Sequence, residues 1–263
     1  MKTEVLYGTH AVKEALAAGR REVVEICVDR SLRASGRLQG ILSEAATRRI
    51  AVREMDPEQI ASLAGTSAHQ GVAARASVYG CRDLSEVLDA VERPASGLVL
   101  ALDQIMDPHN LGALLRTALC AGVEAVLVPK DRSAPPTPAV SKISAGALEH
   151  IRLIQVTNLA RALELLKTRG LWVVGLDRSA ADSLFSGDFS LNLVLVIGGE
   201  GRGMRPLVRR TCDLLVSIPQ MGPLDSLNAS VAAGIALFEI GRQRAIHRLP
   251  NQDDSPDGRR KTL

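Results

Sequence analysis

The chain has 263 residues, of which 46% are hydrophobic and 23% are charged, and its formal net charge is +3. This balance is typical of a globular protein long enough for two domains, and it excludes an intrinsically disordered chain. No apolar run is long enough to span a bilayer and no export signal is evident, so we expect a cytoplasmic protein without a membrane partner.

The four cysteines are scattered without a C-x-x-C pair, which favours free thiols in a reducing compartment over disulfides or a zinc site. The sequence also has no cluster of His, Asp and Glu for another metal. Aromatic residues make up only 2% of the chain, whereas modules that recognise single-stranded bases usually stack them on aromatic rings. A nucleic-acid partner would therefore be held mainly through phosphates, ribose hydroxyls and shape.

Residues 1–78 alternate helical and strand patterns, which predicts a small α/β domain. The predicted helices are Thr9–Ala18, Gly36–Arg49 and Pro57–Ala64, and the predicted strands are Val23–Asp29, Ile50–Met55 and Gly71–Val78. Arginines are frequent in this domain, at positions 20, 21, 30, 33, 37, 48, 49 and 53. Such clustering suits RNA phosphates, and an ordinary solvated basic face is an equal alternative.

Residues 79–97 contain a short amphipathic pattern and then P-A-S-G, which is typical of a linker. Residues 98–246 alternate apolar strands with helices, which predicts an α/β domain with a parallel six-stranded sheet. The predicted strands are Leu98–Leu102, Ala125–Val128, Ile151–Ile154, Leu171–Leu176, Leu193–Ile197 and Leu214–Ile218, and helices begin near Asn110, Ala139, Asn158, Arg205 and Asn228. Residues 247–263 lack periodicity, so we expect a disordered tail.

Three loops of this second domain are dense in polar residues and glycine, and each follows a predicted strand. In an open parallel sheet, ligands bind beyond the carboxyl ends of the strands, so these loops are the first candidates for a site. The first loop runs from Asp103 into a helix that carries Asn110 and Arg116. Taken alone, Asn110 is typical of a helix N-cap, and Arg116, which lies off the apolar stripe of the helix, is typical of a surface arginine.

The second loop has the sequence G-G-E-G-R-G-M and begins with Gly198, Gly199 and Glu200. Glycines permit positive φ and a close approach of backbone amides to a ligand, although a plain tight turn has the same composition. The spacing differs from G-x-G-x-x-G because Met204 occupies the last glycine position, and the loop follows the fifth predicted strand instead of the first. A conventional dinucleotide-binding fold is therefore disfavoured.

The third loop, at positions 218–230, holds two prolines and both apolar and polar residues. Its polar residues Ser226 and Asn228 fit a helix cap as well as a binding site. Its apolar residues Ile218, Met221 and Leu227 are suited to enclosing a purine ring whose edge hydrogen-bonds to the loop backbone. We therefore expect this loop to form one wall of a pocket.

Together the three loops resemble the motifs of the SpoU family of RNA ribose 2′-O-methyltransferases. The motifs present are D-P-x-N-x-G-x-x-x-R-T-A, G-x-E-G-x-G-M and I-P-x-x-G-x-x-x-S-L-N-x-S, in family order. The amino-terminal domain is similar to the substrate-binding domain of the family, with Tyr7-Gly8 before a helix and H-Q-G-V-A-A from position 69. The resemblance covers residues 5–245 and is greatest to the branch that methylates a guanosine in the peptidyl-transferase region of large-subunit ribosomal RNA.

The resemblance implies a SPOUT-type fold with a deep trefoil knot near the carboxyl terminus, and a homodimer with active sites near the subunit interface. It implies S-adenosylmethionine as cofactor and RNA, most simply ribosomal RNA, as partner, with no role for DNA. The catalytic positions that it implies are Asn110, Arg116, Glu200, Ser226 and Asn228. The cofactor-binding positions are Gly198, Gly199, Ile218, Met221 and Leu227. One departure is Gln220, where relatives often carry Met after the Ile-Pro pair.

Methyl transfer to a ribose hydroxyl requires the oxygen to be aligned with the methyl donor and to lose its proton. Because an arginine stays protonated, we expect Arg116 to clamp a substrate phosphate and to make the hydroxyl more acidic. We expect Glu200 and Asn110 to orient Arg116 or the ribose, and Ser226 and Asn228 to fix the cofactor loop. Three alternatives remain open: a transfer-RNA ribose methyltransferase, which would share the motifs, a non-catalytic RNA-binding or ribosome-assembly protein, and an unrelated nucleotide-dependent α/β enzyme.

Overall fold

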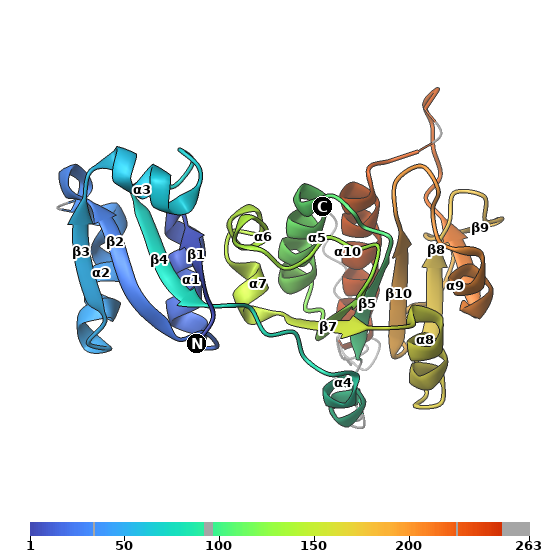
Figure 1. Cartoon of the computed structure of the whole chain (residues 1–263). Helices are drawn as coiled ribbons and strands as arrows, with labels where there is room; N and C mark the ends of the chain where they lie inside the picture. Colours follow the sequence, from blue (N-terminus) through green and yellow to red (C-terminus); the bar gives the residue numbers. More distant parts are fainter. Residues whose placement is uncertain (34, 92–96, 225, 249–263) are drawn as a thin grey trace, which may run out of the picture.

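A computed structural model of the chain describes residues 1–33, 35–91, 97–224 and 226–248, and it contains two separate β-sheets (Figure 1). The smaller sheet has the strand order β1-β4-β2-β3. Its strands are β1 (Thr3–Tyr7), β2 (Val23–Asp29), β3 (Ala51–Met55) and β4 (Val72–Ser77). Strands β2 and β3 are parallel, and β4 is antiparallel to both of its neighbours. The three predicted strands are present, and β1 is an addition to the prediction.

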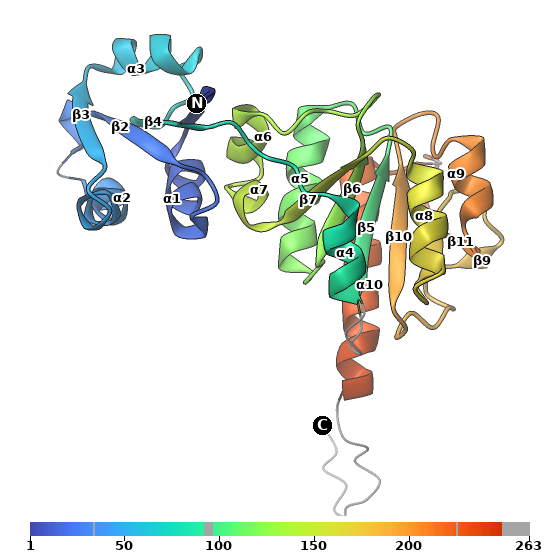
Figure 2. The ribbon, with the colours of Figure 1, turned by 60° about the horizontal axis from the view of Figure 1, so that its bottom comes forward.

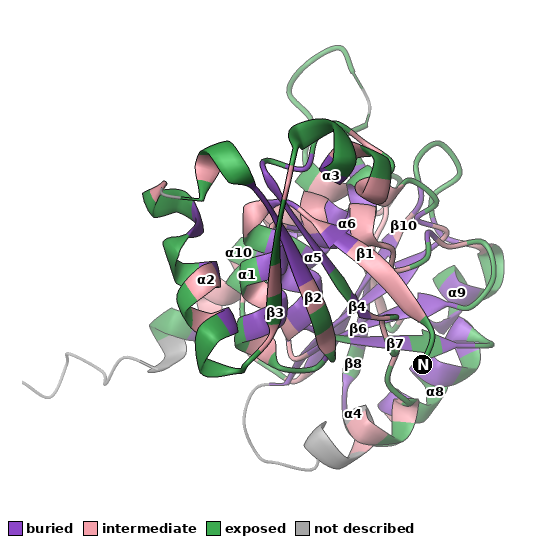
Figure 3. Cartoon of the chain, turned by 60° about the vertical axis from the view of Figure 1, so that its left-hand side comes forward, coloured by how far each residue is buried: buried purple, intermediate pink, exposed green. Residues whose placement is uncertain are grey.

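The helices of this amino-terminal unit cover both faces of its sheet. Helices α1 (Thr9–Ala18) and α2 (Gly36–Thr47) share a core with the strands that includes Leu6, Leu16, Ile26 and Ile41, while α3 (Pro57–Ala64) packs against β1, β2 and β4. In Figure 3 the outer surfaces of these helices are exposed, β2 and β4 are largely buried, and β1 and β3 are mostly intermediate or exposed. A short 3-10 turn, Arg30–Leu32, follows β2. The three helices were predicted from the sequence at nearly these bounds.

The larger sheet has seven strands in the order β7-β6-β5-β10-β8-β11-β9, and all of its pairs are parallel. The strands are β5 (Leu98–Asp103), β6 (Ala125–Pro129), β7 (Arg152–Val156), β8 (Trp172–Leu176), β9 (Asp182–Ser183), β10 (Leu193–Gly198) and β11 (Leu214–Ser217). Six of them match the predicted strands. The prediction of six strands was short by β9, because a two-residue edge strand has no periodicity to detect.

Side chains of the central strands alternate between two buried layers. Leu98, Leu100 and Leu102 of β5 face a layer with α5 (Pro108–Cys120), α6 (Pro138–Ile143), α7 (Ala147–His150) and α10 (Ala229–Arg248). Val99 and Ala101 face the opposite layer, which contains α4 (Leu84–Val91), α8 (Leu159–Lys167) and α9 (Pro206–Thr211). Both faces are buried, which explains why the strands are continuous apolar runs in the sequence.

Two expected segments of irregular chain are only partly within the described residues. The proposed linker at 79–97 includes helix α4, and its residues 92–96 lie outside the described residues. Helix α10 continues to Arg248, two residues into the segment expected to be a tail, and residues 249–263 also lie outside the described residues. The carboxyl-terminal part of α10 projects beyond the sheet (Figure 2). Within the described part of the chain, none of the helices combines the length and apolar character needed to cross a membrane.

Candidate active site

The loop after β5 is anchored at Asp103, a fully buried residue at the last position of the strand. Its carboxylate accepts hydrogen bonds from the backbone N–H and from Nε of Arg205, each at 2.7 Å. Arg205 directly precedes α9, so this contact connects the β5 loop to the glycine-rich chain after β10. A buried carboxylate is tolerated only when it is paired in this way. The two loops are therefore held together at their bases.

The glycine-rich loop folds back on itself beside the first loop. The N–H of Gly203 donates to the carbonyl oxygen of Gly199 at 3.0 Å, and the two residues form an antiparallel bridge. A Cβ at Gly198 would overlap the backbone of Gly203 and Met204, and a Cβ at Gly199 would overlap the carbonyl oxygen of Gln104. These two glycines are therefore required by the packing of the chain itself. The loop is a tight turn, and it also lines a cavity.

Asn110, Glu200 and Asn228, one residue from each loop, form a hydrogen-bonded cluster. Glu200 Oε1 accepts from Asn110 Nδ2 at 2.9 Å and from Asn228 Nδ2 at 2.6 Å. Asn228 Nδ2 also lies 2.9 Å from Asn110 Oδ1. These residues are 28 to 118 positions apart along the chain, so the fold, and not local structure, brings them together.

Helix capping accounts for only part of this cluster. The N-cap of α5 is Asp107, whose carboxylate accepts from the backbone N–H of His109 at 2.9 Å, so the N-cap interpretation of Asn110 is wrong. Asn228 does act as a cap: its Oδ1 accepts from the N–H and the hydroxyl of Ser230 at 2.9 and 2.6 Å. At the same time its Nδ2 group donates the hydrogen bonds to Asn110 and Glu200 in the cluster.

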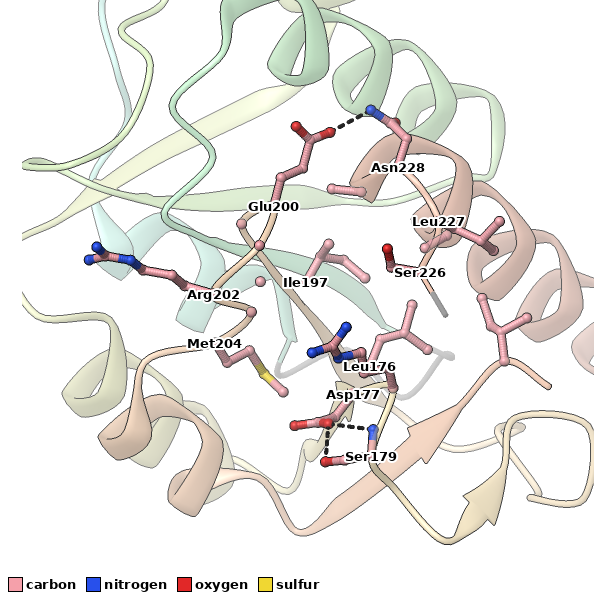
Figure 4. Close-up of a pocket in the computed structure, with 18 of the residues that line it drawn as sticks. Leu176, Asp177, Ser179, Ile197, Glu200, Arg202, Met204, Ser226, Leu227 and Asn228 are labelled. Carbon is pink, nitrogen blue, oxygen red and sulfur yellow. Dashed lines mark hydrogen bonds between the residues drawn. The ribbon is translucent and has the colours of Figure 1, made fainter. Parts of the chain in front are cut away.

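A cavity of about 640 Å³ lies beside the cluster, within the range usual for small-molecule sites. Most of its walls are residues 176–179 at the end of β8, residues 197–204 at the end of β10, and residues 226–229 at the start of α10, and Arg209, Ile218, Gln220 and Ala232 complete them. In Figure 4, Glu200 and Asn228 lie at one end of the cavity and Asp177 and Ser179 at the other, with Ile197 between them. The cavity therefore has two polar ends and an apolar middle.

Eight of the ten residues expected at the site lie at the cavity or in the cluster. Those that line the cavity are Gly198, Gly199, Glu200, Ile218, Ser226, Leu227 and Asn228, and Asn110 joins them through its hydrogen bonds. Met221 does not line it, and its side chain is 98% exposed. Alternate side chains of extended chain point to opposite sides. Ile218 and Gln220 face the cavity, and Met221 points away.

Arg116 also lies outside the cavity lining. It is exposed on α5, where Leu111, Leu114, Leu115 and Ala118 occupy the buried face. Among the described residues it makes no hydrogen bond or ion pair. Within a single chain, its guanidinium is therefore available to a ligand or to another chain.

The sequence analysis missed the segment after β8, which forms the polar end of the cavity opposite Glu200. Asp177 accepts hydrogen bonds from Ser179 N and Oγ at 2.8 and 2.7 Å and from Arg209 Nε at 2.6 Å. Burial alone would raise the pKa of Asp177, but these hydrogen bonds outweigh it and lower the pKa below its ordinary value. Its position directly after a parallel strand was the available signal. No group of three or more His, Cys, Asp or Glu residues suited to a metal occurs in the described ranges.

Two protein-family models match the chain, and each matched segment corresponds to one of the two sheets. Residues 97–238 match the model of the SpoU rRNA methylase family, and residues 5–81 match the model for RNA 2′-O ribose methyltransferase substrate binding. A curated relative, the 23S rRNA (guanosine-2′-O-)-methyltransferase RlmB of Ralstonia nicotianae, is 45% identical over 246 residues. The match covers 93% of this chain and 98% of that protein.

Solved structures of SpoU enzymes also match this chain. The SpoU methyltransferase AviRb of Streptomyces viridochromogenes, in complex with AdoMet, matches with a TM-score of 0.77 and 25% identity, over 93% of this chain and 91% of that one. The TrmH/SpoU tRNA modifying enzyme of A. aeolicus matches with a TM-score of 0.53 and 27% identity, over 62% of this chain and 85% of that one. The chain thus belongs to the SpoU family of S-adenosylmethionine-dependent RNA ribose 2′-O-methyltransferases.

Proposed function

We propose that the protein methylates the ribose 2′-hydroxyl of a guanosine in 23S rRNA, in the peptidyl-transferase region, with S-adenosylmethionine as methyl donor. The observation that carries this proposal is the cluster of Asn110, Glu200 and Asn228 at the edge of a cavity of small-molecule size. The curated relative that aligns with 93% of the chain is named for this activity. A ribosomal RNA substrate implies that the enzyme works in the cytoplasm.

The amino-terminal sheet supports ribosomal RNA over transfer RNA as substrate. The tRNA modifying enzyme of A. aeolicus aligns with only 62% of this chain, whereas the relative named for 23S rRNA aligns with nearly all of it. Arg37, Arg49 and Arg53 of the amino-terminal unit are exposed and make no ion pair among the described residues. Arginines without a carboxylate partner are suited to binding phosphates.

The cavity fits S-adenosylmethionine. Ile218, Leu227 and Ala232 offer an apolar wall for the adenine ring, and the carboxylate of Asp177 suits the ribose hydroxyls of the cofactor. The close packing of Gly199 against Gln104 leaves the backbone of the glycine-rich loop next to the cavity with no side chain in between. When bound, the cofactor supplies a methyl group activated by a positively charged sulfur.

We assign the chemistry at the target ribose to the cluster and to Arg116. The second carboxylate oxygen of Glu200, Oε2, accepts no hydrogen bond in the described part of the chain, so it can orient the ribose hydroxyl or the guanidinium of Arg116. Arg116 binds the phosphate of the target nucleotide and makes the neighbouring hydroxyl more acidic. Ser226 and Asn228 fix the loop that encloses the cofactor.

We further propose that the protein works as a homodimer in which a second chain covers α5 and α10. Phe238 and Val231 of α10 are 57% and 50% exposed, and Met221 and Leu224 of the preceding loop are also exposed. Several large apolar side chains left exposed on one helix and the loop before it are typical of a protein interface. Helix α5, which carries Arg116, packs against α10, and we propose that a partner on this surface reaches Arg116. This accounts for the position of Arg116 outside the cavity of its own chain.

The proposed domain organisation is an RNA-binding domain at 1–78, a linker at 79–97, a methyltransferase domain at 98–246 and a tail at 247–263. In the second domain we propose the SPOUT trefoil knot. Strand order supports the knot, because β10 lies between β5 and β8 while β11 returns to the far side of β8. After β11 the chain runs back past the glycine-rich loop to α10, which packs on α5.

A transfer assay tests the function. The purified protein is incubated with radiolabelled S-adenosylmethionine and either unmodified 23S rRNA transcript or unmodified transfer RNA, and 2′-O-methylation is mapped in the product. We expect label at one guanosine of the 23S rRNA and none in transfer RNA. Label in transfer RNA alone would contradict the substrate. A protein that transfers nothing and binds no S-adenosylmethionine by calorimetry would be the non-catalytic alternative.

A further inference from the structure

The two sheets meet at a junction where α1 and β1 pack against α6 and α7 (Figure 1). A buried ion pair crosses this junction, with Arg21 Nε 2.8 Å from Glu149 Oε2 and the two side chains 2% and 1% exposed. Glu149 also accepts from Ser141 Oγ at 2.7 Å, and the guanidinium of Arg21 lies 5.1 Å from the ring centre of Tyr79. Separation of a buried ion pair is strongly unfavourable. The junction therefore has one preferred geometry.

Lys142, on α6, lies at the same junction without a counter-ion. Its Nζ is 5.8 Å from the ring centre of Tyr7 on β1, and it makes no ion pair within the described ranges. Burial lowers the pKa of Lys142 below its ordinary value, because the ammonium has lost part of its hydration. A ring face offers no lone-pair acceptor, so the N–H donors of Lys142 remain available to an anion.

Gly8 and Gln70 complete the surroundings of this ammonium. Gly8 has a φ of 92°, and a Cβ there would lie 3.1 Å from both Lys142 Nζ and Gln70 Oε1. Gln70 Oε1 is itself fixed, because it accepts from the backbone N–H and the hydroxyl of Thr9 at 3.2 and 3.3 Å. The glycine thus keeps open the space beside the ammonium, and Lys142 is held among neutral groups.

The position of Lys142 is directly connected to the active site. A Cβ on Gly112 would come within 2.7 Å of Ile143 Cβ and 3.2 Å of Ser144 N, the two residues that follow Lys142. Gly112 lies two residues after Asn110 in the first turns of α5. The junction thus lies between the amino-terminal sheet, the proposed RNA-binding unit, and helix α5, which carries Asn110 of the cluster.

We propose that Lys142 binds a backbone phosphate of the RNA substrate at this junction, in a position shaped by Tyr7, Gly8 and Gln70. The proposal rests on the proposed function, which supplies a polyanionic substrate. An unpaired ammonium at this junction does not stabilise the contact between the two domains, because its partial burial carries a desolvation penalty that an apolar side chain would not have. A phosphate of a bound RNA would supply the counter-ion that the ammonium of Lys142 does not have within the described part of the chain.

The salt dependence of RNA binding tests this contact. Binding of in vitro transcribed 23S rRNA is measured by filter retention over a range of NaCl concentrations for the wild type, Lys142→Met and Lys142→Arg. Each phosphate contact contributes about 0.7–0.9 to the slope of log affinity against log salt. We expect Lys142→Met to reduce the slope by about this amount and Lys142→Arg to restore it. The matched control is Lys167→Met on α8, where the lysine is paired with Asp213 at 2.7 Å, and its slope should equal that of the wild type.

A second measurement uses the unmodified protein, so it does not depend on the folding of a variant. Lysines are acetylated with and without 23S rRNA, and mass spectrometry quantifies each site. We expect RNA to protect Lys142 severalfold and to leave Lys167 unchanged. An unchanged slope in Lys142→Met, or no protection of Lys142, would overturn the proposal even if the rRNA is bound and methylated. Failure of the wild type to bind or methylate 23S rRNA would instead overturn the proposed function.

Discussion

A single carboxylate oxygen of Glu200 connects the three loops of the site. It accepts the amide groups of both Asn110 and Asn228, at 2.9 and 2.6 Å. Hydrogen bonds to an ionised acceptor are stronger than those between neutral groups, because the charge adds to the attraction. The geometry of the loops around the cavity therefore depends on the charge of this side chain as well as on its shape.

We predict that Glu200→Gln uncouples catalysis from cofactor binding. The glutamine keeps the size of the side chain but loses the charge, and its amide group replaces an acceptor by a donor. A misplacement of about 1 Å at a reacting centre costs roughly 100-fold in rate, so we expect kcat to fall by about that factor. The affinity for S-adenosylmethionine, measured by calorimetry, should change by less than about threefold. A normal kcat would show that the charge of Glu200 is dispensable.

Arg116 is predicted to act on the RNA and not on the cofactor, because it lies outside the cavity lining. Arg116→Ala should reduce methylation by roughly 1000-fold or more, as expected for loss of a charge clamp in the transition state. Arg116→Lys keeps the charge but cannot make bidentate hydrogen bonds to a phosphate, so its rate should lie between those of Arg116→Ala and the wild type. Both variants should bind S-adenosylmethionine with nearly wild-type affinity in calorimetry. Unchanged turnover in Arg116→Ala would remove the assignment.

The sequence indicates the identity of the site residues better than their orientation. Eight of the ten expected residues lie at the cavity or in the cluster because motif spacing places them at the ends of parallel strands. Met221 was expected at the cavity and Gln220 was noted only as a departure from relatives, but Gln220 lines the cavity and Met221 does not, since neighbouring side chains of extended chain face opposite sides. Composition also cannot tell whether Asn110 or Asp107 caps α5, because both residue types make good caps.

At the scale of elements, the glycine-rich loop is shaped by contact with the loop after β5. Gly199 packs against the carbonyl oxygen of Gln104, and the buried carboxylate of Asp103 holds Arg205 at the other end of the loop. Gln104 itself has a φ of 62°, which few residues other than glycine adopt. The backbone that lines the cavity thus depends on two contacts with a loop that follows a different strand.

Gly199→Ala should therefore weaken cofactor binding and lower the free energy of unfolding. The added methyl group overlaps backbone, which cannot rotate away, and overpacking of this kind costs about 1–3 kcal/mol. We expect a decrease of this size in urea unfolding and a loss of about tenfold in affinity for S-adenosylmethionine. Gly222→Ala is the control, because a Cβ at Gly222 meets no atom within 4 Å. Equal behaviour of the two variants would contradict the packing argument.

Regular elements with a clear periodicity could be predicted, and those stabilised by distant partners could not. The strands β5, β6, β8 and β10 are apolar runs because helices cover both faces, and that pattern is visible in the sequence. Strand β1 has partly exposed side chains and depends on antiparallel pairing with β4, about 70 residues later. Helix α7 has only four residues, too few for a helical period.

At the scale of the whole molecule, two surfaces of the catalytic domain are suited to contacts with another domain or another chain. The junction with the amino-terminal sheet is closed by the ion pair of Arg21 and Glu149, 128 residues apart, and no local pattern in the sequence identifies such a pair. The other surface, on α10 and the loop before it, exposes large apolar side chains. A helix that packs one face on α5 and exposes Phe238 and Val231 on another is suited to a second chain.

Phe238→Arg should convert the proposed dimer into a monomer and abolish methylation. A buried arginine without a partner strongly disfavours an interface, whereas on an isolated chain it replaces a side chain that is already 57% exposed. Light scattering after gel filtration should give twice the chain mass of 28.0 kDa for the wild type and the single-chain mass for the variant. The control is Phe185→Arg, a change of equal charge at a phenylalanine that is 54% exposed after β9. It should remain dimeric and active, and a monomeric wild type with full activity would contradict the assignment of α10 as the interface.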